Sequence, residues 1–311
     1  MKNLLLKPKN SFVHVVILKD SPWATLSYKG INNFFSFKNS SLQEKIFPDV
    51  VLHRIEKSST ELRTLLDTIK GDRNNILVAV GNWCSTMSAD ILEASKGKLP
   101  LFFCGVSNAS QTMPHFTPGI EGIQHSFRKQ AQMLKQLFPH LEKIALSYLV
   151  DLSSEKFMAD TRLGIEIFKQ ELLTQSIRGI DTPISSKKNV DLQLHHLSTQ
   201  GICLFRDTEH SQLLPDIISY AERNNTLLYA SDIGSVYRGV GIGFGDTGYE
   251  YGWETAKLIN QYLNGEKNID ELGVVKLHSP GKLSINNYCI GRQGLNFDQQ
   301  TLHLIRAGLI G

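Results

Sequence analysis

The sequence predicts an α/β protein with two doubly wound sheets of parallel strands, each covered by helices. Short apolar runs alternate with amphipathic segments of helical period, and the pattern stops at a loop-like stretch, 110–122, before it starts again. A continuous β-branched run such as 12–18 is typical of a strand that is buried on both faces, as in parallel sheets. The length of 311 residues suits about two domains.

The first half of the chain alternates expected strands with expected helices. Ser59 and Thr60 open a segment in which Leu62, Leu66 and Ile69 follow helical spacing. The expected strands are 12–18, 50–52, 75–80 and 100–103, and a helix is expected after each of the first three. This β-α-β order favours a parallel sheet.

The second half repeats the pattern and ends in a glycine-rich segment. Its expected helices are 127–138, 154–173, 190–197 and 213–223, and its expected strands are 143–148, a weaker 175–180, 201–205 and 226–230. In 239–245 four glycines alternate with apolar residues, which predicts a strand with one face free of side chains. Thr247 and Glu250 fit a capping box, so the next helix is expected to begin there.

Charge and composition exclude several classes of function. The formal net charge is +3 and the basic residues are scattered, so a nucleic-acid partner is not expected. The four cysteines lack a Cys-x-x-Cys spacing and the ten histidines lack a ligand spacing, so neither a metal nor a cofactor is expected.

The sequence is compatible with two cellular locations. No apolar run approaches the length of a membrane span, and the leucines near Met1 are too few for a signal peptide. The protein is expected to be periplasmic or at the cell surface if a leader precedes this sequence, and cytoplasmic if Met1 is the native start.

One motif indicates an enzyme. The stretch 243–248 fits G-x-G-x-x-G, follows a strand and opens a helix, as in dinucleotide-binding folds. However, it lies late in the chain, and the next strand-like run ends in His278-Ser279, without an acid for a ribose. The glycines are better interpreted as positions of close packing, and a nucleotide- or nucleotide-sugar-using enzyme is kept as the alternative. The chain also lacks G-x-S-x-G, so the chemistry indicated is binding, without catalytic residues.

Small polar and aromatic residues gather where expected strands end. Ligands of doubly wound sheets bind at the carboxyl ends of the strands. Ser85, Ser107, Asn108, Asp207, Thr208, Ser231 and Asp232 lie at such ends. Trp23 and Trp83 also follow strand ends, where each could be a loop anchor or the wall of a ligand pocket.

Several segments resemble one protein family. The stretch 119–148 contains G-I-E-G-I-Q-H-S-F and M-L-K-Q-L-F-P-H-L-E-K-I-A-L-S-Y, which is similar to "G-V-T-G-V-S … L-L-K-E-L-L-P-x-x-K-R-I-G-V-L-Y". Three further segments resemble patterns of the same family: 231–252, L-N-G-E-K at 263–267 and K-L-S-I-N at 282–286. The chain thereby resembles the substrate-binding proteins of ABC importers, in the group that includes tryptophan- and tyrosine-uptake proteins, from about Phe12 to Ile305.

The resemblance implies a type I periplasmic-binding-protein fold, with two lobes joined by about three crossovers and closing on a ligand between them. The implied lobes are 1–122 plus 237–275 and 123–236 plus 276–311. The implied partners are a small molecule, which could be an aromatic amino acid, and an ABC transporter permease. An intracellular ligand-sensing module of the same fold is a further alternative.

The resemblance also assigns roles to the strand-end residues. Asp232 is the expected partner of a ligand ammonium, and Ser85 and Ser107 could hold a carboxylate. Trp23, Trp83 and Tyr148 could flank a flat side chain. Asn82, Asn108, Asp207 and Thr208 complete the expected ligand-binding set, although their loops differ from the family pattern.

Overall fold

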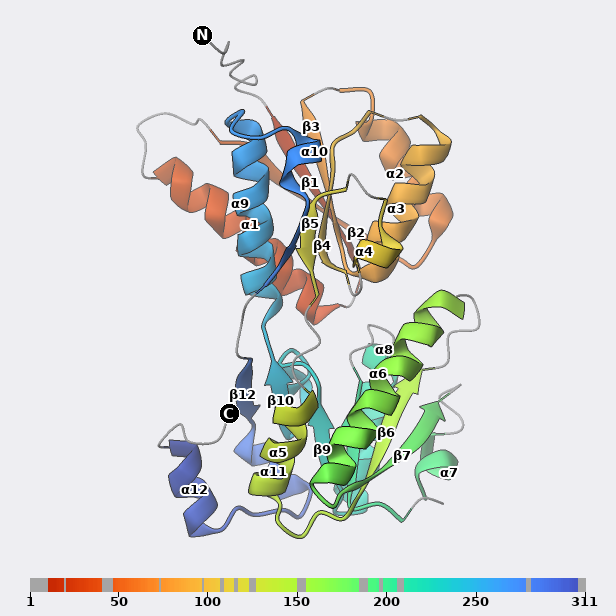
Figure 1. Cartoon of the computed structure of the whole chain (residues 1–311), viewed down its shortest axis with the longest axis vertical. Helices are drawn as coiled ribbons and strands as arrows, with labels where there is room; N and C mark the ends of the chain where they lie inside the picture. The colour runs from red at the N-terminus through yellow and green to blue at the C-terminus, as the bar shows by residue number, and fades with distance from the viewer. Residues whose placement is uncertain are drawn as a thin grey trace. The chain divides into compact units, whose positions relative to one another are not determined.

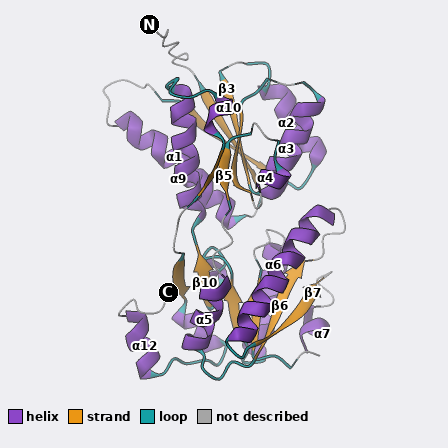
Figure 2. Cartoon of the chain, in the orientation of Figure 1, coloured by secondary structure: helices purple, strands orange, loops and turns teal. Residues whose placement is uncertain are grey.

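The chain folds into two compact units, each built around its own sheet. The computed structural model describes residues 11–19, 21–40, 47–72, 74–96, 98–106, 109–114, 117–122, 127–149, 155–184, 190–195, 198–205, 210–277 and 281–306. Unit 1 comprises 1–124 and 247–279, and unit 2 comprises 125–246 and 280–311. Helices flank the strands of each unit on both sides (Figure 2).

Unit 1 contains a six-stranded sheet in the order β11-β5-β4-β3-β1-β2. Its strands are β1 (Phe12–Leu18), β2 (Asp49–Ile55), β3 (Asn75–Val80), β4 (Leu101–Val106), β5 (Gly119–Glu121) and β11 (Val274–Lys276). All of the described pairings in this sheet are parallel. Both central strands, β3 and β4, are buried along their whole length, as expected for a sheet covered on both faces.

Helices cover both faces of the first sheet. They are α1 (Pro22–Ser40), α2 (Ser59–Ile69), α3 (Asn82–Ala94), α4 (Ala109–Thr112), α9 (Gly248–Leu263) and α10 (Ile269–Leu272). One apolar cluster joins α1 and α9 to one face, and a second cluster joins α2 and α3 to the other.

The helices α1 and α9 lie side by side in unit 1 although their sequences are about 220 residues apart (Figure 1). A Cβ atom on Gly252 would lie 1.9 Å from the carbonyl oxygen of Ser27, and one on Gly30 would lie 2.2 Å from that of Tyr249. Such distances are impossible for a real side chain, so the two backbones can approach this closely only with glycine at these positions.

Unit 2 contains a six-stranded sheet in the order β12-β10-β9-β8-β6-β7. Its strands are β6 (Lys143–Leu149), β7 (Arg178–Ile184), β8 (Gly201–Leu204), β9 (Leu227–Ala230), β10 (Ile242–Gly245) and β12 (Lys282–Ile285). The edge strand β12 pairs with β10 in antiparallel direction, and the other described pairings are parallel. The fold is therefore the predicted pair of parallel-dominated α/β sheets.

The helices of unit 2 also form two layers. They are α5 (Phe127–Leu137), α6 (Glu155–Thr174), α7 (Val190–His195), α8 (His210–Arg223), the 3-10 helix Val236–Arg238, α11 (Asn287–Arg292) and α12 (Gln299–Arg306). The clusters place α5 and α6 on one face of the sheet and α7 and α8 on the other. Figure 1 shows α5 and α6 in front of the strands of this unit.

Three expectations about the chain path need correction. The segment 237–246 was expected in the first lobe, but it belongs to unit 2, because β10 pairs with β9 and β12 of the second sheet; residues 276–279 were expected in the second lobe, but they belong to unit 1, where Lys276 ends β11. The stretch 110–122 was expected to be loop-like, but it contains most of α4 and all of β5.

The glycine-rich strand is shorter than expected. It runs only over Ile242–Gly245, while Gly239 ends the preceding 3-10 helix with a left-handed φ of 113°. Ile242 and Phe244 point into the core of unit 2, as the alternation predicted. The predicted capping box of Thr247 and Glu250 is present at the start of α9.

Candidate functional site

Each sheet has one point at which the order of its strands reverses. In unit 1 it lies between β1 and β3, and in unit 2 between β6 and β8. Ligands of doubly wound sheets bind beside the carboxyl ends of the strands at such a point. Trp23 and Asn82 follow β1 and β3, and Tyr148 lies near the end of β6, so three of the predicted residues flank these points.

Trp23 is held in place by packing within unit 1. Pro22 opens α1, and the hydroxyl of Ser21 accepts a hydrogen bond from the backbone N–H of Ala24 at 3.2 Å, which stabilises this helix start. The half-buried indole packs edge-on against Tyr251, with ring centroids 5.2 Å apart. It also covers Gly105 at the end of β4, where a Cβ atom would lie 2.1 Å from the ring. Trp23 is therefore an anchored ring beside the edge of the sheet, with part of its surface exposed.

The first turn of α3 leaves Asn82 and Trp83 half-buried but buries Ser85 completely. Gly81 turns the chain after β3 with a φ of 81°, and both Asn82 and Trp83 remain half-buried in the first turn of the helix. Ser85 is completely buried, and its hydroxyl donates a hydrogen bond to the carbonyl oxygen of Ala79 at 2.9 Å. The prediction that Ser85 holds a ligand carboxylate is wrong, because its hydroxyl is used inside the β3–α3 turn.

Tyr148 is a core residue in this structure. Its side chain is only 4% exposed and belongs to the apolar cluster under α5 and α6. Burial raises the pKa of its hydroxyl, the hydrogen-bonded carboxylate of Asp181 raises it further, and Arg162 lowers it. The ring is thus not the accessible wall that the sequence predicted, and its polar end faces Asp181 and Arg162.

Asp232 forms the start of a tight turn after β9. Its carboxylate accepts hydrogen bonds from the backbone N–H of Ser235 at 2.8 Å and from the Ser235 hydroxyl at 2.7 Å. The neighbouring Ser231 donates its hydroxyl to the carbonyl oxygen of Leu204 at 3.3 Å. Both residues are half-buried. Because each carboxylate oxygen can accept two hydrogen bonds, Asp232 keeps the capacity to bind an ammonium group.

A buried hydrogen bond that the sequence did not predict supports this edge of unit 2. The hydroxyl of Tyr229, the residue before Ala230 at the end of β9, donates to the side-chain oxygen of Gln130 at 2.5 Å. Burial raises the pKa of Tyr229 far above its ordinary value, and the nearby Cys203 and Asp232 act in the same direction. The phenol therefore stays protonated and fixes α5 to β9, the strand that precedes Asp232.

Glu121 is a second carboxylate that sequence reasoning missed. It ends β5, is only 8% exposed, and pairs with Lys276 at the end of β11, with Nζ and Oε1 3.3 Å apart. Its other oxygen, Oε2, is buried and has no hydrogen-bond partner within the described chain. The signal was available in the sequence, because Glu121 stands in G-I-E-G-I where the family pattern has threonine.

Four predicted site residues, Ser107, Asn108, Asp207 and Thr208, lie outside the described residues. Within the described part of the chain, no group of three or more His, Cys, Asp or Glu residues could hold a metal ion. No described helix is both long enough and apolar enough to span a membrane.

The fingerprint glycines have packing partners. A Cβ atom on Gly243 would lie 2.4 Å from the carbonyl oxygen of Asp232, and one on Gly248 would lie 2.0 Å from that of Trp23. These contacts confirm the interpretation of the motif as close backbone packing. The space that a pyrophosphate would need at these two positions is filled by protein backbone.

The two reversal points and the pair of similar sheets define the fold, which is the two-unit α/β fold of type I periplasmic binding proteins. The sequence profile described as ABC transporter substrate binding protein matches residues 24–306, so the chain belongs to that family. This is a family of binding proteins for transporters, not of enzymes, and it is typically extracytoplasmic.

Solved structures with the same fold cover nearly the whole chain. A conserved domain protein from Vibrio cholerae has a TM-score of 0.75 at 15% identity, and the alignment covers 95% of this chain and 98% of that one. An ABC domain in complex with L-Trp from Streptococcus pneumoniae has a TM-score of 0.73 at 18% identity, with 94% and 98% covered. A putative LacI transcriptional regulator from Bacteroides fragilis has a TM-score of 0.64 at 12% identity, with 90% and 98% covered. No curated protein sequence matches the chain.

Proposed function

We propose that this substrate-binding protein binds an amino acid and delivers it to an ABC transporter permease. An aromatic amino acid is the first candidate. The observation that carries the proposal is a carboxylate at the carboxyl-end edge of each sheet, Glu121 in unit 1 and Asp232 in unit 2. A carboxylate that is partly removed from water suits an ammonium group, because charge-assisted hydrogen bonds are stronger than neutral ones.

The aromatic preference is supported by two tryptophans at the edge of unit 1. Trp23 and Trp83 are half-buried at the edge of unit 1, and a partly exposed indole can stack on a flat side chain. Asn82, Ser107, Asn108, Asp207, Thr208 and Ser231 complete the proposed ligand-binding set. The L-Trp complex of the pneumococcal protein of this fold makes tryptophan and tyrosine the first ligands to test.

A thermal-shift screen of the twenty amino acids, followed by calorimetry, tests the proposal. A true ligand at about 100 times its Kd should stabilise the protein by about 2.7 kcal/mol. Asp232→Asn keeps the acceptor for the Ser235 N–H but removes the charge, and we expect it to weaken binding about 10- to 100-fold. Glu121→Gln should act in the same direction.

Asp67→Asn is the matched control, because Asp67 is exposed on α2 and pairs only locally with Lys70. It should leave both the affinity and the melting temperature unchanged. If no amino acid shifts the melting temperature, the proposed ligand class is refuted. If Asp232→Asn and Glu121→Gln both bind an amino acid as tightly as the parent protein, the two carboxylates are not its binding residues.

A ligand-sensing module of the same fold is the second candidate, since the similar structures include a LacI-type regulator. Both candidates require a small ligand, and they differ in the partner. Stimulation of ATP hydrolysis by a reconstituted ABC transporter in the presence of the loaded protein would support transport, and its absence with a functional transporter would favour sensing.

A further inference from the structure

Unit 1 carries a pocket at the amino-terminal ends of its strands, opposite the carboxyl-terminal ends beside which the amino-acid site is proposed. Its volume is about 430 Å³. Four parts of the unit line it, which are the last turns of α3, the start of β4, the segment before β5 and the start of α10. None of the proposed amino-acid-binding residues belongs to this lining.

The lining of the pocket is mainly apolar. Leu92, Leu99 and Leu101 are each only 7% exposed, so they form its floor. The half-buried Ile269 and the exposed Pro114 add to its walls. The pocket therefore offers a hydrocarbon surface that a ligand can cover.

Two exposed side chains of opposite charge, Glu93 and Lys96, also line the pocket. The backbone N–H of Lys96 donates to the carbonyl oxygen of Glu93 at 3.1 Å, which fixes both residues at the end of α3. Among the residues that the structure describes, neither side chain has an ion-pair partner. The pocket thus presents a carboxylate, which accepts hydrogen bonds, and an ammonium group, which donates them, beside an apolar floor.

The backbone holds Lys96 in a conformation that favours glycine. Its φ is 48°, in the left-handed region. Helices commonly end with a glycine, or with an asparagine, in this conformation. Residues held in such unfavourable conformations are concentrated at functional sites, so a lysine at this position points to a role for its side chain.

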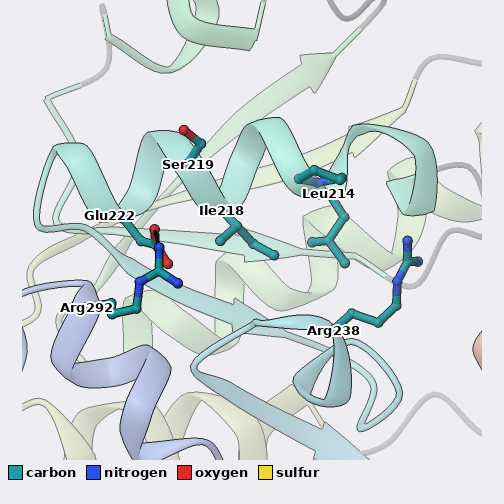
Figure 3. A pocket seen from close by; sticks show the side chains of 7 residues that line it. Leu214, Ile218, Ser219, Glu222, Arg238 and Arg292 are labelled. Atoms are coloured by element: carbon teal, nitrogen blue, oxygen red, sulfur yellow. Dashed lines mark hydrogen bonds and ion pairs between the residues drawn. The ribbon is translucent and has the colours of Figure 1, made fainter.

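Unit 2 also has a pocket, and its charges are arranged differently (Figure 3). Its volume is about 370 Å³, and it lies between α8 and α11. Arg292 pairs there with Glu222, with Nη2 and Oε2 2.5 Å apart. The Glu222 carboxylate is therefore already bound by an arginine of the same pocket, whereas Glu93 and Lys96 of the unit 1 pocket can both turn to a ligand.

Size and chemistry together restrict the ligand of the unit 1 pocket. Its volume lies within the range for small-molecule sites, roughly 300–1,000 Å³. A ligand carboxylate would be attracted by Lys96 and repelled by Glu93, and a ligand ammonium group would meet the reverse. A neutral primary amide suits both, because its oxygen accepts a hydrogen bond and its NH₂ group donates. It also costs less to remove from water than a charged group.

We propose that this pocket binds a short aliphatic primary amide, with its oxygen on Lys96, its NH₂ group on Glu93 and its hydrocarbon chain on the three leucines. The site goes beyond the proposed transport function, because it uses other residues and needs no ammonium group on the ligand. The hydrocarbon chain supplies most of the affinity, since polar contacts to exposed charged groups contribute little.

The experiment uses the full chain with ¹³C-labelled isoleucine methyl groups and hexanamide as the probe. We expect hexanamide to shift the Ile269 methyl signal, which an Ile269→Val variant assigns. The affinity should rise about fourfold per methylene from butanamide to hexanamide. Hexanoate and hexylamine should bind about two- to fivefold less tightly than hexanamide, because each keeps only one of the two polar contacts.

Two pairs of variants test the floor and the charges of the pocket. Ala89→Leu fills the pocket from α3 and should weaken hexanamide binding at least about tenfold, because about two methylenes of the ligand lose their contact. Ala94→Leu, at an exposed position of the same helix, should not change it. Lys96→Asn should weaken binding about two- to fivefold, and Lys98→Asn, an exposed lysine outside the lining, should not.

Melting temperatures equal to that of the parent protein establish that the variants fold, and if Ala89→Leu melts lower, Lys96→Asn decides. The proposal is overturned if hexanamide leaves the Ile269 signal unchanged, or if hexanoate or hexylamine binds more tightly than hexanamide. It is also overturned if a folded Ala89→Leu or Lys96→Asn binds hexanamide as tightly as its control. Asp232→Asn should keep hexanamide binding, so this result and the amino-acid screen can fail independently.

Discussion

The two units have the same strand order but complete their edges differently. In each, the first strand lies between the second and the third, and the last position is taken by a strand from late in the chain. In unit 1 that strand, β11, is parallel to β5 and brings Lys276 to the buried Glu121. In unit 2, β12 is antiparallel to β10, whose last residue, Gly245, has no side chain.

The same strand order can therefore end in a parallel or an antiparallel edge strand, with different side chains at that edge. Unit 1 is tightened by two helices in backbone contact and by the packed ring of Trp23. Unit 2 instead has a turn after β9 whose start is fixed by the hydrogen bonds between the Asp232 carboxylate and Ser235. The fold fixes where ligand groups can lie, and the connecting segments decide which groups these are.

The largest expected change in stability comes from disrupting the contact between α1 and α9 in unit 1. Gly252→Ala would place a methyl group 1.9 Å from the carbonyl oxygen of Ser27, so the helices must separate. We expect a loss of about 3 kcal/mol in the free energy of unfolding, measured by urea denaturation. Gly291→Ala in α11 is the matched control, because nothing lies within 4 Å of the new atom there, and it should be neutral or slightly stabilising. Equal stability losses in the two variants would contradict the described packing.

A smaller effect is expected at the buried hydrogen bond of unit 2. Tyr229→Phe leaves the side-chain oxygen of Gln130 buried without its donor, which should cost about 1–3 kcal/mol of stability. The double variant Tyr229→Phe with Gln130→Met removes both polar groups and should recover part of the loss. A double variant less stable than the sum of the two single changes would show that the hydrogen bond is not the cause.

The smallest effect should be a pH dependence of unit 1. His14 on β1 and His53 on β2 share a hydrogen bond, with Nδ1 and Nε2 2.9 Å apart. Burial lowers the pKa of both below the ordinary 6.5. Asn75 and Asp72 partly offset this at His14, and the charge of His14 lowers the pKa of His53 further.

The sign of the pH effect follows from proton uptake. Below about pH 6.5 the unfolded chain binds protons that the folded pair does not, so stability should fall as the pH is lowered through this value. Urea unfolding at pH 7.5, 6.5 and 5.5 measures the slope, and the His14→Phe, His53→Leu double variant should flatten it. A slope that is unchanged in this variant would assign the effect to other groups.

Elements with long uninterrupted patterns could be predicted closely from the sequence. The ranges expected for β1, α2 and β3 agree with the structure residue for residue, because apolar runs and helical spacing are local signals. The β7 strand was expected at 175–180 but is Arg178–Ile184, since its pattern is interrupted by Asp181 and Pro183. The glycines before β10 looked like part of the strand, because their tertiary contacts are not visible in the sequence.

The sequence showed which candidate residues follow strands, but it could not show the direction of their side chains. Sequence reasoning put Ser85 and Tyr148 at strand ends. Ser85 lies in the first turn of α3 and Tyr148 near the end of β6, and both side chains turn into the protein. Sequence reasoning also passed over Glu121, whose burial and pairing with Lys276 depend on a strand about 155 residues later in the chain. The direction of a side chain and its distant partners are decided by packing, which local pattern does not contain.

The late position of α9 and β11 has a consequence for the order of synthesis. Residues 1–124 leave the ribosome without the helix that packs against Gly30 and without the strand that completes their sheet. At about 5–20 residues per second, the missing pieces follow only after roughly 6–30 s, with all of residues 125–246 synthesised in between. The first part of the chain to be made therefore acquires its last helix and strand after most of unit 2 has been synthesised.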